Sequence, residues 1–155
     1  MPPPKPRAKL ARVPSAFWDT SAIIPLCCWQ SQTAKARQAY RLFPSVVVWW
    51  ATGVECNSAL YRLERDQELS AQQTQQALEA LAHQRQRWVE VAPLDEVRNL
   101  AERLLRAHSL RAADALQLAA ALVWCNSYPQ DRTFIGGDDR LLDAAKKEGF
   151  NTLRV

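Results

Sequence analysis

The sequence predicts a single α/β domain built around a parallel sheet with helices on both faces. Short apolar segments alternate along the chain with longer segments of helical periodicity, as in repeated strand–helix units. Most of the short segments are apolar throughout, whereas a strand with one solvated face would alternate apolar and polar residues. The length of 155 residues and the hydrophobic content of 48% suit one domain with one sizeable core.

Five segments are short and apolar enough to be strands. The clearest is SVVVWW (45–50), where three consecutive β-branched residues favour an extended backbone. WVEVA (88–92) alternates as a strand does, and RTFIGG (132–137) combines a strand with a glycine turn. SAFW (15–18) and TLRV (152–155) complete the set.

The segments between the strands have helical periodicity. Ser70 and Gln73 form a capping-box sequence, which marks the start of one helix. Residues 112–125 are apolar on two faces, so we expect this helix to be buried in the core. In chain order, the expected helices are residues 21–29 with a disturbance at Pro25, 33–42, 51–68, 70–87, 97–105, 112–125 and 140–148.

Three carboxylates each stand alone in a long uncharged stretch of the chain. They are Asp19 within residues 13–34, Glu55 within residues 42–61 and Asp114 within residues 112–130. Such stretches form a core, where an ionised side chain without a partner costs several kcal/mol or takes up a proton. Three such costs in one small domain indicate that the acids surround a positive charge, and a metal ion is the simplest candidate.

The expected strands bring these acids to one edge of the sheet. Asp19 directly follows the first strand, and Asp138 follows the strand that ends in the Gly-Gly turn. Glu55 lies in the first turns of the helix after SVVVWW, and Asp114 opens a helix whose N-terminus would stabilise its charge. Because sites in α/β sheets form at the carboxyl ends of the strands, we expect the four carboxylates to meet there.

A cluster of carboxylates suits Mg²⁺ or Mn²⁺, hard cations that prefer oxygen ligands. Zinc fits poorly, because His83 and His108 have no companions at ligand spacing. Held by carboxylates, Mg²⁺ can activate water and stabilise the leaving oxygen of a phosphodiester. The alternative is structural, with the acids acting as helix caps and half-exposed strand ends.

Four segments also carry a family resemblance. They are WDTSAIIPL (18–26), ATGVECNSAL (51–60), LRAADALQLAAAL (110–122) and FIGGDDRLLDAAKKEGF (134–150). Together they resemble the PIN-domain ribonucleases, most closely the VapC-type toxins of bacterial toxin–antitoxin pairs. The resemblance covers residues 16–155 and implies a PIN-like three-layer fold, with a five-stranded parallel sheet flanked by helices. It also implies Mg²⁺-dependent endoribonuclease activity on RNA, a homodimer, and silencing by a cognate antitoxin.

The resemblance assigns roles to individual residues. The metal-binding and catalytic acids of the family fall on Asp19, Glu55, Asp114 and Asp138. A hydroxyl residue that supports the first acid falls on Ser21. Asp139 adjoins the fourth acid and could take its place or support it, although Asp138 keeps the following helix in the family's register. The family often has Thr or Ser where this chain has Gly136.

The net charge of +4 is concentrated at the N-terminus. The basic residues there are Lys5, Arg7, Lys9 and Arg12, and the other 16 of the 20 basic residues balance the 16 acids. We therefore divide the chain into a basic, proline-rich leader (1–14), expected to be disordered, and one PIN-like domain (15–155). The leader could contact the phosphates of RNA, but a disordered, solubilising leader is the commoner explanation. Arg111 is a candidate RNA contact, although a surface arginine near the start of a helix needs no such role. We expect a cytoplasmic protein without membrane contact, because there is no signal peptide or apolar run of roughly 18 residues.

Two other functions remain open. A phospho-receiver-like signalling domain also combines an α/β fold, clustered acids and Mg²⁺, but Asp19 has no acidic neighbour and no lysine ends the TFIGG strand. A PIN-like module that binds RNA or a protein without cutting would have no need for charges in apolar settings. The function that we expect is therefore that of a metal-dependent ribonuclease.

Overall fold

The computed structural model describes residues 12–155, so most of the expected leader lies outside the described residues. The strands are β1 (Ser15–Trp18), β2 (Ser45–Trp49), β3 (Val89–Val91), β4 (Thr133–Gly136) and β5 (Asn151–Arg154). The helices are α1 (Thr20–Cys27), α2 (Thr33–Leu42), α3 (Thr52–Arg65), α4 (Ala71–Arg85), α5 (Asp95–Ala107), α6 (Ala112–Trp124) and α7 (Asp139–Glu148). Each expected strand and helix is present, with small differences at the ends.

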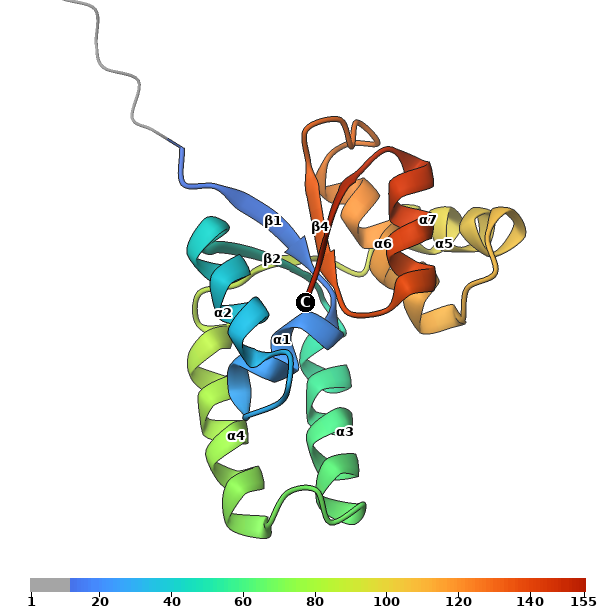
Figure 1. The fold of residues 1–155 in the computed structure, drawn as a ribbon. Coiled ribbons are helices and arrows are strands. Elements are labelled where there is room, and N and C mark those ends of the chain that lie inside the picture. Colours follow the sequence, from blue (N-terminus) through green and yellow to red (C-terminus); the bar gives the residue numbers. More distant parts are fainter. Residues whose placement is uncertain (1–11) are drawn as a thin grey trace, which may run out of the picture.

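All five strands run parallel in one sheet, in the order β3-β2-β1-β4-β5 (Figure 1). From β1 the chain builds outward through β2 and β3, and it then returns to place β4 and β5 on the other side of β1. The direction of building therefore reverses between β1 and β4. The carboxyl ends of these two strands form the topological switch point, where α/β sheets leave a crevice for a ligand.

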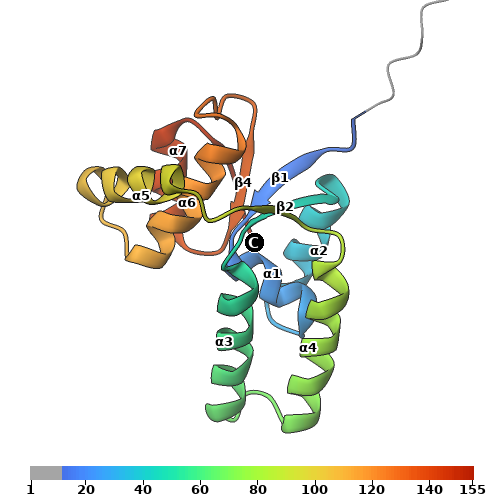
Figure 2. The same cartoon turned by 180° about the vertical axis from the view of Figure 1, so that it is seen from behind.

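The sheet has a separate apolar core on each face, because successive strand residues point to opposite sides. Phe17 and Val47 pack with residues of α5, α6 and α7. Trp18 and Val48 pack with residues of α1, α2, α3 and α4 on the opposite face. Both views show α3 and α4 on one side of the molecule and α5–α7 on the other (Figures 1 and 2). The predicted three-layer α/β fold with a five-stranded parallel sheet is confirmed.

The central helix of one layer is α6, and it is buried along most of its length as its two apolar faces predicted. Leu118 and the alanines at 119–121 are fully buried, and these small side chains let α5 pack closely against it. A helix so enclosed holds its first turn in a fixed place at the edge of the sheet. Among the helices of residues 12–155, none is both long and apolar enough to cross a membrane.

The hairpin of α3 and α4 differs slightly from the expectation. The predicted capping box is present, because Ser70 and Gln73 exchange side-chain and backbone hydrogen bonds at the start of α4. However, α3 ends at Arg65 rather than near residue 68. The chain turns there through Gln67, whose φ of 61° is incompatible with a continuing helix.

Glu148, at the end of α7, links this helix to α5. Its Oε2 accepts a hydrogen bond from Arg103 at 3.0 Å, and its Oε1 lies 2.7 Å from Nε2 of His108. Burial alone would raise the pKa of Glu148, but the bonds from Arg103 and His108 outweigh it and hold the pKa below its usual value. The contact is therefore stronger when Glu148 is ionised.

We expect Glu148→Gln to lower the free energy of unfolding by about 1 kcal/mol at neutral pH. A carboxyl with a lowered folded-state pKa stabilises the fold above its unfolded pKa, and this stabilisation is lost as the pH falls through the folded pKa. The difference from the parent protein should therefore disappear in acid. Urea unfolding at neutral and acidic pH measures it, with Glu102→Gln at an exposed α5 position as the control. An equal loss at both pH values would contradict this account.

Candidate functional site

Asp19 occupies the topological switch point of the sheet. β1 ends at Trp18, and the backbone N–H of Asp19 donates to the carbonyl of Ile135 in β4 at 2.9 Å. Although Asp19 carries a carboxyl group, only 6% of the residue is exposed. It caps α1, because its side chain accepts a hydrogen bond from the Ser21 N–H at 3.1 Å. The buried acid that the sequence predicted is therefore present at the end of β1.

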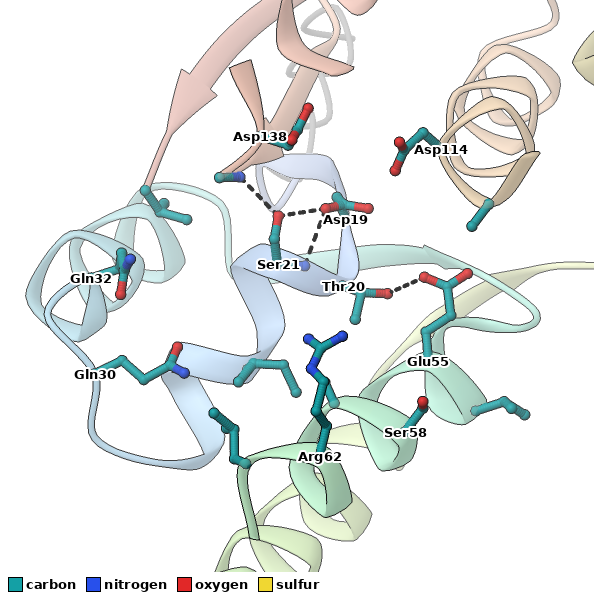
Figure 3. Close-up of a pocket in the computed structure, with 17 residues that line it drawn as sticks. Asp19, Thr20, Ser21, Gln30, Gln32, Glu55, Ser58, Arg62, Asp114 and Asp138 are labelled. Atoms are coloured by element: carbon teal, nitrogen blue, oxygen red, sulfur yellow. Dashed lines mark hydrogen bonds between the residues drawn. The ribbon is translucent and has the colours of Figure 1, made fainter. Parts of the chain in front are cut away.

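Ser21 connects the two chain segments that leave β1 and β4. Its hydroxyl donates to Oδ2 of Asp19 and accepts a hydrogen bond from the Gly137 N–H at 2.8 Å (Figure 3). The hydroxyl therefore fixes one oxygen of the Asp19 carboxylate relative to the end of β4. Ser21 therefore lies where a residue that supports Asp19 would be expected.

Glu55 projects from the first turn of α3 toward α1. Its Oε2 accepts a hydrogen bond from the Thr20 hydroxyl at 2.7 Å (Figure 3). The same oxygen accepts from Nε2 of Gln117 on α6 at 3.0 Å. Glu55 is thus held from two neighbouring helices and is half-buried beside Asp19.

Gln117 is a positioning residue that the sequence analysis missed. It is 1% exposed, and its Nε2 also lies within hydrogen-bond distance of the hydroxyls of Thr20 (3.1 Å) and Thr52 (3.2 Å). It therefore joins α1, α3 and α6 behind the acids. The signal was present in the sequence, because Gln117 is the one polar residue between Asp114 and Trp124. A lone polar residue in an apolar helix needs buried partners.

The other two acids come from the helical layer on the opposite face of the sheet. Asp114 is half-buried in the first turn of α6, whereas Asp138 is exposed and caps α7 by accepting a hydrogen bond from the Leu141 N–H at 2.9 Å. All four predicted acids line one cavity of about 670 Å³ (Figure 3). The cavity thus lies where both helical layers meet the carboxyl edge of the sheet.

The acids of the cavity are close enough to affect one another's ionisation. Burial raises the pKa of Asp19 to about 6, aided by the charges of Glu55 and Asp114 and opposed by the hydrogen bonds from Ser21. Burial also raises the pKa of Asp114, and the charge of Asp138 adds to this effect. Four carboxylate side chains and one arginine, Arg62, line the cavity, so its charge is net negative, which favours a cationic ligand.

Carboxylate oxygens are suitable ligands for a hard divalent cation, but the acids are too far apart in this conformation for three of them to bind one ion. Asp19, Glu55 and Asp138 each use a single oxygen in the hydrogen bonds described above. Their second oxygens have no hydrogen-bond partner within residues 12–155 and can act as ligands. Within the same residues, however, no three His, Cys, Asp or Glu side chains are grouped closely enough to hold one ion. Side-chain rotation would be needed to bring three carboxylates to a cation.

Two predicted residues lie outside the cavity lining. Asp139 is exposed and pairs with Arg154 instead of lining the cavity. Arg111 is exposed beside the cavity, and its charge opposes the rise in the pKa of Asp114. Its proposed contact with RNA stays a prediction. Arg62 does line the cavity, and the sequence analysis did not identify it, although it lies two helical turns after Glu55 on α3.

Comparisons with known proteins support the fold. No protein-family model and no curated protein sequence matches the chain. The fold is similar to that of the protein PAE2754 from Pyrobaculum aerophilum, with a TM-score of 0.54 and 19% sequence identity over 92% of this chain and 91% of that one. It is also similar to a chain in a toxin–antitoxin complex from Klebsiella pneumoniae, with a TM-score of 0.52 and 19% identity over 80% of this chain and 87% of that one.

We expect Asp19→Asn to stabilise the metal-free protein at pH 7.5. The folded-state pKa of Asp19 is raised from 3.8 to about 6, so its ionisation destabilises the fold, and stability is lost as the pH rises through this range. Each pKa unit corresponds to roughly 1.4 kcal/mol, which sets an upper limit of about 3 kcal/mol on the gain from an uncharged side chain.

Urea unfolding in metal-free buffer at pH 4 and pH 7.5 tests this expectation. The gain should be present at pH 7.5 and nearly absent at pH 4, where Asp19 is largely protonated in the folded state. Asp143→Asn is the matched control, because Asp143 is exposed, lies outside the cavity and forms no ion pair within residues 12–155. A severe loss of stability in Asp19→Asn at pH 7.5 would show that the carboxylate serves mainly to hold the fold.

Proposed function

We propose that this protein is a metal-dependent endoribonuclease that hydrolyses RNA phosphodiesters. The observation that carries the proposal is the convergence of four carboxylates from four chain segments on one cavity at the topological switch point. The residues proposed to bind the metal and to act in catalysis are Asp19, Glu55, Asp114 and Asp138. The resemblance of the four segments that carry these acids to PIN-domain ribonucleases also supports the proposal.

The chain would contribute orientation and charge to this reaction. Ser21 holds one oxygen of Asp19, while Thr20 and Gln117 hold one oxygen of Glu55. Mg²⁺, or Mn²⁺ in its place, would neutralise charge on the phosphodiester and lower the pKa of the attacking water. Without a cation, the clustered carboxylates would repel the phosphates of RNA, so we expect strict metal dependence.

We further propose that the protein is the toxin of a toxin–antitoxin pair. The fold similarity to a chain in a toxin–antitoxin complex and the resemblance to VapC-type toxins support this role. On this proposal the partners are an RNA substrate and a cognate antitoxin protein, and the chain acts in the cytoplasm as a homodimer.

A second candidate is a PIN-like module that binds RNA or protein without cutting. One observation favours it, namely that no three metal-ligating side chains within residues 12–155 are grouped at the distance one ion requires. A receiver-like domain is less well supported, because β4 is followed by Gly137 and Asp138 rather than by a phosphate-binding lysine.

The experiment that separates these functions is cleavage of total cellular RNA by the purified protein, with Mg²⁺, with Mn²⁺ and with EDTA. We expect discrete fragments that require either metal. Asp19→Asn should lower the cleavage rate by about 100-fold or more. The substitution removes a negative charge that would hold the metal ion against the reacting phosphate. Asp139→Asn serves as the control and should cleave at close to the parent rate.

Cleavage that is equal in Asp19→Asn and in the parent would identify a contaminating nuclease. A well-folded parent protein that binds RNA and leaves it intact in both metals would favour the non-catalytic module.

A further inference from the structure

The cavity extends well beyond the four acids. Its other half lies over α1 and α3, and among residues 12–155 it contains no carboxylate side chain other than that of Glu55 at its border (Figure 3). The side chains that line this half include Ile24, Gln30, Gln32, Ser58, Arg62 and Leu63. We call this part of the cavity the α1–α3 half. It combines one cation, two amides and apolar surface, which differs chemically from the acidic half.

Arg62 is the cation of the α1–α3 half. It follows Glu55 by seven residues on α3, so both side chains lie on the same face of the helix. Its guanidinium points into the cavity below Thr20 and Glu55 (Figure 3). It is the one basic residue among those that line the cavity, and within residues 12–155 it forms no ion pair with any acid.

An unpaired arginine next to clustered carboxylates suits a second phosphate of a nucleic acid strand. The phosphate at the acids would need a cation, whereas the next phosphate along the strand brings a further negative charge that the acids repel. A guanidinium neutralises that charge and can form two parallel hydrogen bonds to phosphate oxygens. Arg62 is therefore placed where it would offset the repulsion between the acids and a flanking phosphate.

Gln30 and Gln32 lie on the short connection between α1 and α2, and this connection is held in place. The backbone N–H of Gln30 donates to the Thr33 hydroxyl at 2.9 Å, and that hydroxyl donates to the carbonyl of Pro25 at 2.9 Å. Thr33 is itself buried, with 1% exposure. Side-chain amides on a fixed connection can donate to and accept from the edge of a base without a large ordering cost.

We propose that the α1–α3 half of the cavity is a nucleotide subsite for single-stranded RNA. In this subsite Arg62 binds the phosphate that flanks the scissile one, and Gln30 and Gln32 contact the attached base. The proposal rests on the proposed function, which supplies RNA as the substrate class. It adds the direction in which the RNA strand leaves the acids, namely across α1 and α3. Arg62 is a positioning residue in this account, and the acids keep their own roles.

The test compares Arg62→Gln and Arg62→Lys with Arg65→Gln. Arg65 lies one turn further along α3, is exposed and does not line the cavity, so its replacement removes the same charge from the same helix. Binding of a fluorescein-labelled RNA oligonucleotide is measured in Ca²⁺ over a range of salt concentrations, so that affinity is separated from cleavage. Thermal unfolding establishes that each variant is folded.

We expect Arg62→Gln to weaken RNA binding about tenfold and to reduce the slope of log affinity against log salt by about one. Arg62→Lys should retain the salt slope and recover part of the affinity, because it keeps the charge and loses the bidentate geometry. Arg65→Gln should stay within about twofold of the parent, as expected for a charge that contacts no phosphate. In cleavage assays the Arg62→Gln defect should appear mainly in KM.

The outcomes distinguish the subsite from the proposed function. Metal-dependent cleavage with equal RNA affinity and equal salt slope in Arg62→Gln and the parent would overturn the subsite and leave the nuclease standing. Arg62-dependent RNA binding without cleavage in Mg²⁺ or Mn²⁺ would support the subsite and overturn the nuclease. A folded parent protein that does not bind the oligonucleotide would overturn the subsite.

Discussion

The structure depends on one unfavourable feature, the buried carboxylate of Asp19 at the end of β1. β1 is a central strand of the sheet, and the residue that follows it lies between both helical layers. A carboxyl group there loses most of its contact with water, and the hydrogen bonds from Ser21 offset only part of this loss. Glu55 and Asp114 increase the cost instead of reducing it. Binding of a cation next to Asp19 is the simplest interaction that would offset this cost.

The two helical layers contribute differently to this arrangement. Behind the acids, Gln117 connects the layers, because it sits on α6 and reaches Thr20 on α1 and Glu55 on α3. The burial of α6 in its own layer fixes both Gln117 and Asp114, which share the N-terminal half of that helix. The acids are thus oriented by the packing of the core, while the cavity in front of them stays accessible. Rotation of individual carboxylates would still be needed to complete a metal site.

The sequence was informative where a residue type conflicted with its surroundings. Strands were recognisable because parallel strands are apolar on both faces, and Asp19 was recognisable because it interrupts such a stretch. The choice between Asp138 and Asp139 followed helical register, and the structure places Asp138 in the cavity lining and Asp139 on the surface with Arg154.

Residues with roles that depend on tertiary packing were harder to find. Gln117 and Arg62 become meaningful only when α6 and α3 are brought next to α1, and an isolated sequence does not specify that packing. Arg62 in particular resembles any surface arginine of an amphipathic helix. The end of α3 was also missed, because the left-handed turn at Gln67 has no glycine or asparagine to mark it.

We propose that the four acids at the carboxyl edge of the sheet, with Asp19 at the end of β1, form a binding site for a divalent cation. The decisive measurement is calorimetric titration of the metal-free protein with Mn²⁺ near pH 6, which requires no knowledge of the substrate. We expect saturable binding by the parent protein that releases protons, because Asp19 is partly protonated at this pH and must ionise to bind the metal. We also expect Asp19→Asn to lose this binding. Absence of binding to a well-folded parent protein, or equal binding by Asp19→Asn, would rule out a metal site at Asp19.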